Sequence, residues 1–179
     1  MNAHAASPIA LIGLMGAGKS EVARLLAARL DAPAIDLDAR IEAESGRSIP
    51  EWFDVPGESA FRERERHALE SALAAGAAVI ACGGGIVLDP VARDLLAECC
   101  RTVWLEVSPA EAARRLEGGE LSRPLLAGQP NREAQLERLL NSRAALYRAA
   151  SRFRVMTDGR SAEQVGELVW AALAAAERP

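Results

Sequence analysis

Aromatic residues are scarce in this chain of 179 residues, at 4% of the total, and no apolar run approaches the length of a membrane span. The formal net charge of −4 lacks the strong basic excess that is typical of nucleic-acid surfaces. The first eight residues, MNAHAASP, lack the basic start and the long apolar stretch of a secretory signal, so we expect a short ragged terminus there. Neither a membrane nor a nucleic acid is therefore an expected partner.

Cysteine is also rare, with only Cys82, Cys99 and Cys100 in the sequence. The number is odd and two of the residues are adjacent, which argues against a disulfide framework. A reducing, cytoplasmic location fits this pattern best. We expect all three to be small buried apolar residues.

Short apolar runs and amphipathic stretches alternate along the chain. The runs predict strands over residues 9–12, 33–37, 78–82, 102–107 and 153–156. Helical spacing and capping residues predict helices over 19–30, 58–75 and 131–150, and further helices beginning near Ala39, Ser48, Asp89, Ser108 and Ser161. Ser108, Pro109 and Glu111 form the pattern of a capping box, as do Ser161 and Gln164. The alternation predicts one α/β domain over residues 1–179, with a parallel sheet covered by helices on both faces.

The strongest motif is the stretch GLMGAGKS at residues 13–20, which matches G-x-x-x-x-G-K-[ST] between an expected strand and an expected helix. Glycines let backbone N–H groups approach triphosphate oxygens, and the following helix points its N-terminus at the anion. Lys19 can reach the β- and γ-phosphates, and the Ser20 hydroxyl can bind Mg²⁺. A glycine turn followed by a surface lysine is the alternative, and the strand–helix context favours a nucleotide-binding loop.

Two aspartates, Asp36 and Asp38, follow the second expected strand, at the edge of an open parallel sheet where ligands bind. Alternation along a strand would place both on the same side. One could hold Mg²⁺ through water, and the other could accept a proton from a substrate hydroxyl. The pattern fits equally well with aspartates that cap the helix beginning near Ala39.

Other candidates are less specific. Arg62 lies on a helix rich in arginine and glutamate, where most such residues are solvated. Gly83, Gly84 and Gly85 follow the third expected strand and could bring a ligand against backbone N–H groups, or could form a tight turn. Arg123 lies in a glycine- and proline-rich segment, residues 117–130, that we expect to be a mobile loop able to close over ATP. An ordinary surface arginine is the alternative there.

Taken together, the stretches GLMGAGKS, DLD, GESAFRERE, GGG, SRPLL and SRAALYR resemble shikimate kinases, in the family order and near the family spacing. The resemblance runs from about residue 9 to residue 170. It implies a phosphate-loop kinase fold with strand order 2-3-1-4-5, a substrate-binding helical region over about 40–69, and a lid over about 116–128. The implied reaction is ATP-dependent phosphorylation of the 3-hydroxyl of shikimate, on the route to aromatic amino acids, by a monomer.

The resemblance also implies residue roles. Catalysis would depend on Lys19, Asp38 and Arg123, and metal binding on Ser20 and on Asp36 through water. ATP would contact Gly16, Ala17, Gly18, Lys19, Ser20, Glu21, Arg115, Arg123 and Arg160. Shikimate would contact Asp38, Arg62, Gly83, Gly84, Gly85 and Arg143, with the two arginines holding its carboxylate.

Two positions depart from the family pattern: Glu21 stands where threonine is usual, and Ala23 where glycine is common. A carboxylate at position 21 is unfavourable near the α-phosphate unless it points away or is paired. Two other functions remain open: a kinase of another small hydroxy acid or polyol, and a ligand-sensing domain that has kept the fold without turnover. The second is usually attached to a DNA-binding segment, which this sequence does not contain.

Overall fold

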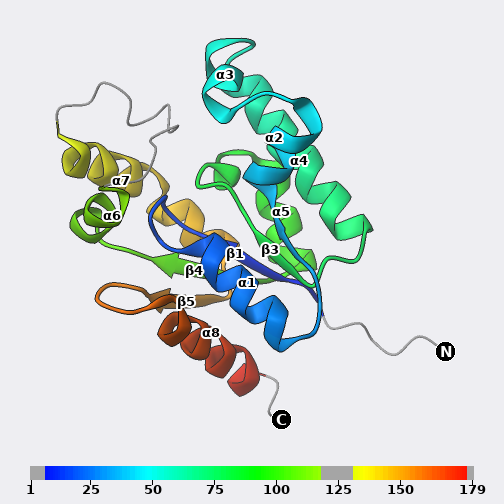
Figure 1. Cartoon of the computed structure of the whole chain (residues 1–179), viewed down its shortest axis with the longest axis vertical. Helices are drawn as coiled ribbons and strands as arrows, with labels where there is room; N and C mark the ends of the chain where they lie inside the picture. Colours follow the sequence, from blue (N-terminus) through cyan, green and yellow to red (C-terminus); the bar gives the residue numbers. More distant parts are fainter. Residues whose placement is uncertain (1–6, 118–130, 177–179) are drawn as a thin grey trace.

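The computed structural model describes residues 7–117 and 131–176 (Figure 1). Within them, five strands form one sheet: β1 (Ile9–Ile12), β2 (Ala34–Asp36), β3 (Val79–Ala81), β4 (Arg101–Glu106) and β5 (Phe153–Met156). All neighbouring strands are parallel, and their order is β2-β3-β1-β4-β5. The predicted α/β class and strand order are therefore confirmed.

Helices connect the strands and cover both faces of the sheet (Figure 1). They are α1 (Lys19–Arg29), α2 (Leu37–Ser45), α3 (Ile49–Asp54), α4 (Glu58–Ala74), α5 (Pro90–Cys99), α6 (Pro109–Leu116), α7 (Arg132–Ala150) and α8 (Ala162–Ala176), with a 3₁₀ turn, η1, at Ile86–Leu88. In Figure 1 the segment α2–α3–α4 projects upward from the β2–β3 side of the sheet. No helix in the described part of the chain is both long enough and apolar enough to cross a membrane.

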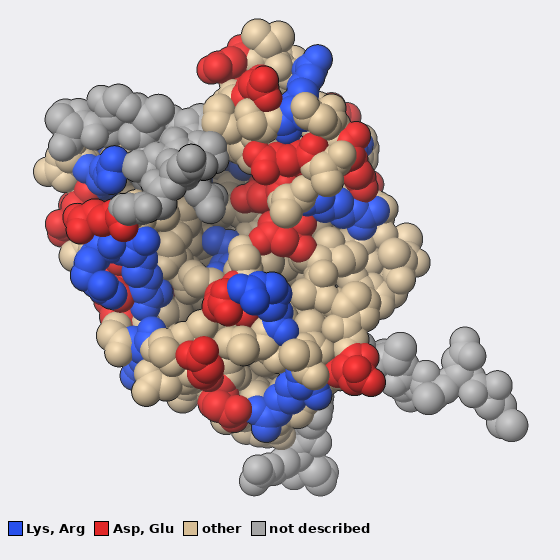
Figure 2. Space-filling view, in the orientation of Figure 1, with Lys and Arg blue, Asp and Glu red and all other residues tan. Residues whose placement is uncertain are grey.

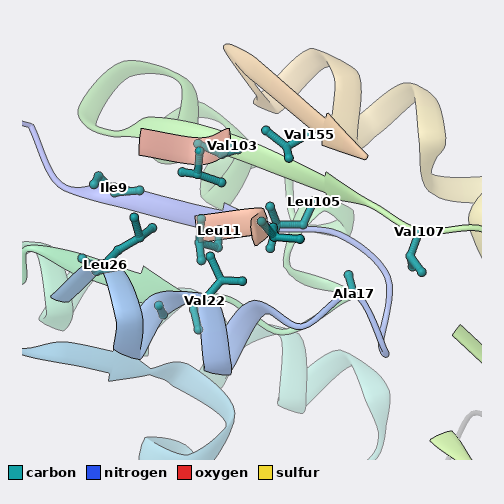
Figure 3. Packing of buried hydrophobic residues seen from close by; sticks show 14 of the residues in the cluster. Ile9, Leu11, Ala17, Val22, Leu26, Val103, Leu105, Val107 and Val155 are labelled. Carbon is teal, nitrogen blue, oxygen red and sulfur yellow. The ribbon is translucent and has the colours of Figure 1, made fainter. Parts of the chain in front are cut away.

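Two hydrophobic clusters fill the space on the two sides of the sheet, because alternate residues of a strand point to opposite faces. In β1, Ile9 and Leu11 join the cluster beneath α1 and α8. Figure 3 shows them packed over Val22 and Leu26 of α1. Ala10 and Ile12 join the cluster beneath α4, α5 and α7. The central strand is thus buried on both faces, which explains why its sequence is continuously apolar rather than alternating.

The predicted capping boxes differ in outcome. At Ser161 and Gln164 both reciprocal hydrogen bonds are present, so that prediction is confirmed. Ser108 caps α6 by accepting from the Glu111 N–H, but its own N–H donates to Asp158 instead. The predicted box at Ser108 is therefore wrong in its second half, because the Glu111 carboxylate binds arginines instead.

Two further expectations are corrected. The second strand ends at Asp36, and α2 begins at Leu37, so Asp38 lies in the first turn of a helix rather than beside Asp36 on a strand. Asp36 ends the strand because its side chain accepts the Ala39 N–H and caps the helix. Cys82 and Cys100 are buried as expected, but Cys99 is exposed at the end of α5.

Candidate active site

The loop between β1 and α1 depends on its glycines. Gly13, Gly16 and Gly18 have φ angles of 138°, 80° and 86°, in the left-handed range that other residues rarely adopt. A Cβ atom on Gly13 would lie 2.2 Å from the carbonyl oxygen of Leu105, so this glycine also permits close packing against β4. Gly18 faces open space and precedes α1 without a side-chain cap, which leaves the first N–H groups of the helix for an anion.

Lys19, the first residue of α1, folds its side chain back along this loop. Its Nζ donates hydrogen bonds of 3.0 Å to the carbonyl oxygens of Gly13 and Leu14. The ammonium group is thereby held against the hollow that the loop lines. In this position it can bind phosphate oxygens of a nucleotide seated on the loop.

Ser20 and Asp36 connect the loop to the end of β2. The Ser20 hydroxyl donates to one carboxylate oxygen of Asp36, while the other oxygen caps α2 through the Ala39 N–H. The capping interpretation is therefore confirmed for Asp36, and the same carboxylate is held against the loop serine. A hydroxyl and a carboxylate oxygen together are ligands of the kind that Mg²⁺ prefers.

Glu21 points along its own helix towards Arg24, with which it forms an ion pair. Both side chains are largely exposed, so the pair contributes little to stability. Glu21 nevertheless lines the same hollow as Gly18 and Lys19. The negative charge predicted to oppose phosphate binding is therefore paired, but it remains next to the candidate phosphate site.

The hollow at the carboxyl edge of the sheet has a volume of about 350 Å³. It lies between the α6 side and the α2 side of the molecule, where Figure 2 shows a depression flanked by charged side chains. Its lining residues are Met15, Gly16, Gly18, Lys19, Ser20, Glu21, Asp36, Asp38, Cys82, Arg115 and Leu116. The phosphate loop and Asp38 thus share one cavity although Asp38 comes from a different part of the chain.

Two of the three glycines after β3, Gly83 and Gly85, make room for charged side chains. A Cβ atom on Gly83 would lie 2.1 Å from Glu65 Oε1 and 2.7 Å from Asp38 Oδ1, and one on Gly85 would lie 2.1 Å from Arg62 Nη1. None of the three has a positive φ. Space, rather than backbone conformation, therefore requires glycine at positions 83 and 85.

Arg62 is held by two carboxylates of its own helix, α4. Its Nη2 donates to Glu58 at 2.7 Å, and its Nη1 donates to Glu65. The side chain is only 12% exposed, unlike a solvated helix-surface arginine. It therefore lies against Gly85, largely removed from solvent, rather than on the solvated face that the alternative interpretation expects.

Glu65 was not among the residues singled out from the sequence. Its side chain is 1% exposed, and its Oε1 accepts no hydrogen bond from the described residues. Burial raises the pKa of this carboxyl to about 7, Arg62 opposes the rise, and the nearby Asp38 charge adds to it. The i,i+3 spacing from Arg62 predicts an ion pair, but Glu58 has an equally suitable i,i+4 spacing, so the sequence signal does not single out Glu65.

Arg143 and Tyr147, both on α7, reach the glycine turn from the opposite side. The Arg143 Nη1 and the Tyr147 hydroxyl both donate to the Gly84 carbonyl oxygen, at 3.2 Å and 2.5 Å. Arg143 is 4% exposed, yet among residues 7–117 and 131–176 it forms no ion pair with a carboxylate. A buried guanidinium group with this environment favours an anionic ligand, since buried charges in proteins are normally paired.

Arg115 lies at the other end of the hollow and ties three segments together. It donates to the Gly16 carbonyl at 3.2 Å, to the Thr157 carbonyl at 2.6 Å and to Glu111 at 2.8 Å. With Arg160 and Gly18 it also lines a neighbouring hollow of about 170 Å³. Arg115 and Arg160, both predicted to contact ATP, are thus brought together beside the phosphate loop.

Arg123 and residues 118–128 of the predicted lid lie outside the described residues. All the other predicted site residues lie within them and gather at the carboxyl edge of the sheet.

The family model for shikimate kinase matches residues 15–174 of this chain. A shikimate kinase of Rhodococcus erythropolis is 43% identical over 160 residues, covering 89% of this chain and 93% of that protein. A shikimate kinase of Thermobifida fusca is 42% identical over 166 residues, covering 93% and 94%.

Comparison with solved structures also finds a shikimate kinase. The structure of shikimate kinase from Acinetobacter baumannii in complex with shikimate superposes with a TM-score of 0.92 at 31% identity, covering 97% of this chain and 96% of that one. A gluconokinase from Sinorhizobium meliloti has a TM-score of 0.61 at 20% identity, a similarity of fold alone. The family model and the relatives both span most of the sequence, and the chain belongs to the shikimate kinase family.

Proposed function

We propose that the chain transfers the γ-phosphoryl group of ATP to the 3-hydroxyl of shikimate, giving ADP and shikimate 3-phosphate. The observation that carries this proposal is the cavity in which the phosphate loop and Asp38 meet, with the largely buried Arg62 and the buried Arg143 around the adjoining glycine turn. The phosphate loop suits a nucleotide anion. Asp38 with the two arginines suits an acceptor that has hydroxyls and a carboxylate.

The nucleotide occupies the loop side of the cavity in this proposal. The backbone of Gly16, Ala17 and Gly18 and the start of α1 bind the phosphates, and Lys19 neutralises charge on the β- and γ-phosphates. Arg115 and Arg160 flank the base in the neighbouring hollow. Arg123 is proposed to close over the phosphates and to stabilise charge during transfer.

Ser20 and Asp36 are proposed to hold Mg²⁺, Ser20 directly and Asp36 through water. Their oxygen donors suit this ion, and the described residues contain no cluster of three or more His, Cys, Asp or Glu that would favour another metal. Mg²⁺ bound there supplies positive charge to the phosphate oxygens. The few protein ligands are consistent with its preference for water and substrate phosphates.

The acceptor occupies the glycine-turn side. Arg62 and Arg143 bind its carboxylate, while Gly83, Gly84 and Gly85 allow it to approach the backbone. Asp38 accepts a hydrogen bond from the 3-hydroxyl and receives its proton as the oxygen attacks the γ-phosphorus and the bond to the ADP oxygen breaks. Catalysis then comes mainly from positioning and charge neutralisation.

We also infer that the reaction takes place in a monomer and in a reducing cytoplasm. All proposed substrate contacts come from one chain, so a monomer suffices, and the free thiols suit a reducing cytoplasm.

A coupled assay for ADP release tests this function. We expect release that depends on both shikimate and ATP, and that is lost when Mg²⁺ is chelated. Release with other hydroxy acids or polyols but not with shikimate would replace the proposed acceptor. Shikimate binding without any ADP release by folded protein would support a ligand-sensing domain.

A further inference from the structure

Glu65 is a buried charged residue on the acceptor side, and the proposed reaction gives it no role. Its Oε2 accepts from Arg62, while Oε1 points at Gly83, near Asp38 Oδ1. Oε1 is buried and accepts no hydrogen bond from the described residues. A carboxylate oxygen in this position is costly while it is charged, and protonation would relieve that cost.

The groups around Glu65 come from several elements. Arg62 faces it from α4, Asp38 from α2 and Arg143 from α7, and their charges act on it in opposite directions. The Tyr147 hydroxyl and the Cys82 thiol are also near, but burial raises the pKa of Tyr147 to about 12 and that of Cys82 well above its usual value. Neither of these two groups therefore exchanges a proton near neutral pH, whereas the Glu65 carboxyl, with a pKa of about 7, does.

The protonation equilibrium of Glu65 depends on how strongly the positive charge of Arg62 stabilises the carboxylate. Arg62 already divides its donors between Glu65 and Glu58. An anionic ligand at Arg62 and Arg143 would take part of this positive charge and add a negative charge to the same buried volume. Both effects favour the neutral form of a neighbouring carboxyl.

We propose that binding of the acceptor's carboxylate at Arg62 and Arg143 is coupled to uptake of one proton by Glu65. The carboxylate of Glu65 takes the proton from the solvent and becomes a carboxylic acid, and no other bond changes. Glu65 then acts as a positioning residue, because it releases Arg62 to the ligand without leaving an uncompensated charge in the site. This inference depends on the proposed function, since it requires an anionic acceptor at these arginines.

The pKa of about 7 in the ligand-free protein fixes the pH range in which the coupling is visible. Below about pH 6 the carboxyl is already protonated, so binding takes up almost no proton. Above pH 7 the Glu65 carboxyl is mostly ionised in the free protein, and under this proposal it is protonated in the complex. We therefore expect uptake of a large fraction of a proton at pH 7.5–8, and acceptor affinity that falls as the pH rises through this range.

Isothermal titration calorimetry of the full chain with shikimate, without nucleotide, tests the inference. At each pH, titrations in two non-competing buffers with different ionisation heats (HEPES and Tris at pH 8, MES and piperazine at pH 5.5) give the number of protons taken up. The number follows from the dependence of the observed heat on the ionisation heat of the buffer. We expect uptake in the wild type at pH 8 but not at pH 5.5. Glu65→Gln should bind shikimate without uptake at either pH, whereas Glu58→Gln, which removes the other partner of Arg62, should retain it.

Two ligand and variant controls identify the proton's destination. The methyl ester of shikimate, which lacks the charge, should bind more weakly and with no proton uptake. Uptake that persists in Glu65→Gln but disappears in Asp38→Asn would assign the proton to Asp38 and overturn the inference.

The wild-type result alone keeps the inference testable should Glu65→Gln fail to fold. Shikimate binding with no proton uptake between pH 7 and pH 8 would overturn the inference and leave the proposed function intact. No binding at all by folded protein would overturn both.

Discussion

On the phosphate side of the cavity the protein presents mainly backbone, with Gly13, Gly16 and Gly18 in left-handed conformations and a single ammonium group folded over them. On the acceptor side it presents buried charged side chains packed against glycines, with Arg62, Glu65 and Arg143 nearly removed from solvent. The first arrangement binds an anion with preformed dipoles. The second assembles charges whose protonation and pairing depend on one another, so its ligand changes the site's own electrostatics.

Removal of the ammonium group should produce the largest effect. Lys19→Ala should lower kcat for ADP release by at least about 10³-fold, because charge on the transferring phosphoryl group is no longer neutralised. The fold should persist, since β1 and α1 pack through apolar residues that the substitution leaves unchanged. Steady-state kinetics and thermal unfolding check this. Lost activity accompanied by a lost cooperative transition would contradict a purely electrostatic role.

Lys19 is also the only lysine in the sequence, which gives this prediction an independent control. An amine-reactive reagent should modify the wild-type protein at Lys19 and at the α-amino group alone. ATP with Mg²⁺ should protect Lys19 and not the α-amino group, as measured by mass spectrometry of the intact protein and its peptides. Equal modification of Lys19 with and without ATP would place the nucleotide elsewhere.

The acceptor side should carry a stability cost that the phosphate side lacks. The pKa of Glu65 is raised to about 7 from 4.5, so its contribution to stability is greatest below pH 4.5 and is lost as the pH rises to about 7. Glu65→Gln avoids this loss. Arg62 retains Glu58 as a partner, so the variant does not leave an isolated buried charge.

We therefore expect Glu65→Gln to exceed the wild type in unfolding free energy by an amount on the order of 3 kcal/mol at pH 8. The difference should shrink towards zero near pH 4.5. Urea unfolding of both proteins across this pH range measures it. A variant that is less stable than the wild type at pH 8 would show that the Arg62 ion pair outweighs burial.

Loss of the Arg62 guanidinium should separate the two sides kinetically. Arg62→Ala should raise KM for shikimate by about 10²-fold, since a paired, charge-assisted contact to the carboxylate is lost. KM for ATP should change less than about threefold, because Arg62 lies beside Gly85 rather than the loop. Arg64→Ala is the matched control: Arg64 is on the same helix but pairs with Glu44, and both KM values should stay near wild type. Equal rises in both KM values for Arg62→Ala would break the division into two sides.

The difference between the sides also explains what the sequence could predict. The phosphate loop and the strand order follow from local signals: a contiguous motif, apolar runs and caps. The interpretation of Asp36 and Asp38 as strand neighbours is wrong because a capping hydrogen bond ends β2 one residue earlier than the apolar pattern suggested. Glu65 could not be distinguished from the other glutamates of α4, since its burial depends on Gly83 and Asp38, which are distant in sequence.

Glu21 offers the smallest and most informative test, because it places a negative charge on the anion-binding side. Its ion pair with Arg24 is exposed, so solvent and salt screen much of the effect on bound phosphate. Glu21→Thr should raise ATP affinity about two- to fivefold at low salt, and the gain should vanish near 0.5 M NaCl.

Arg24→Gln, which leaves Glu21 without this partner, should lower ATP affinity by a similar factor. When Glu21 has already been replaced by threonine, Arg24→Gln should lower ATP affinity less than it does in the wild type, since the Glu21 charge that Arg24 balances is gone. Nucleotide titrations measure all four proteins. Additive effects in the double variant would mean that Glu21 and Arg24 act on the phosphates independently and that their pairing does not explain how the loop tolerates a carboxylate.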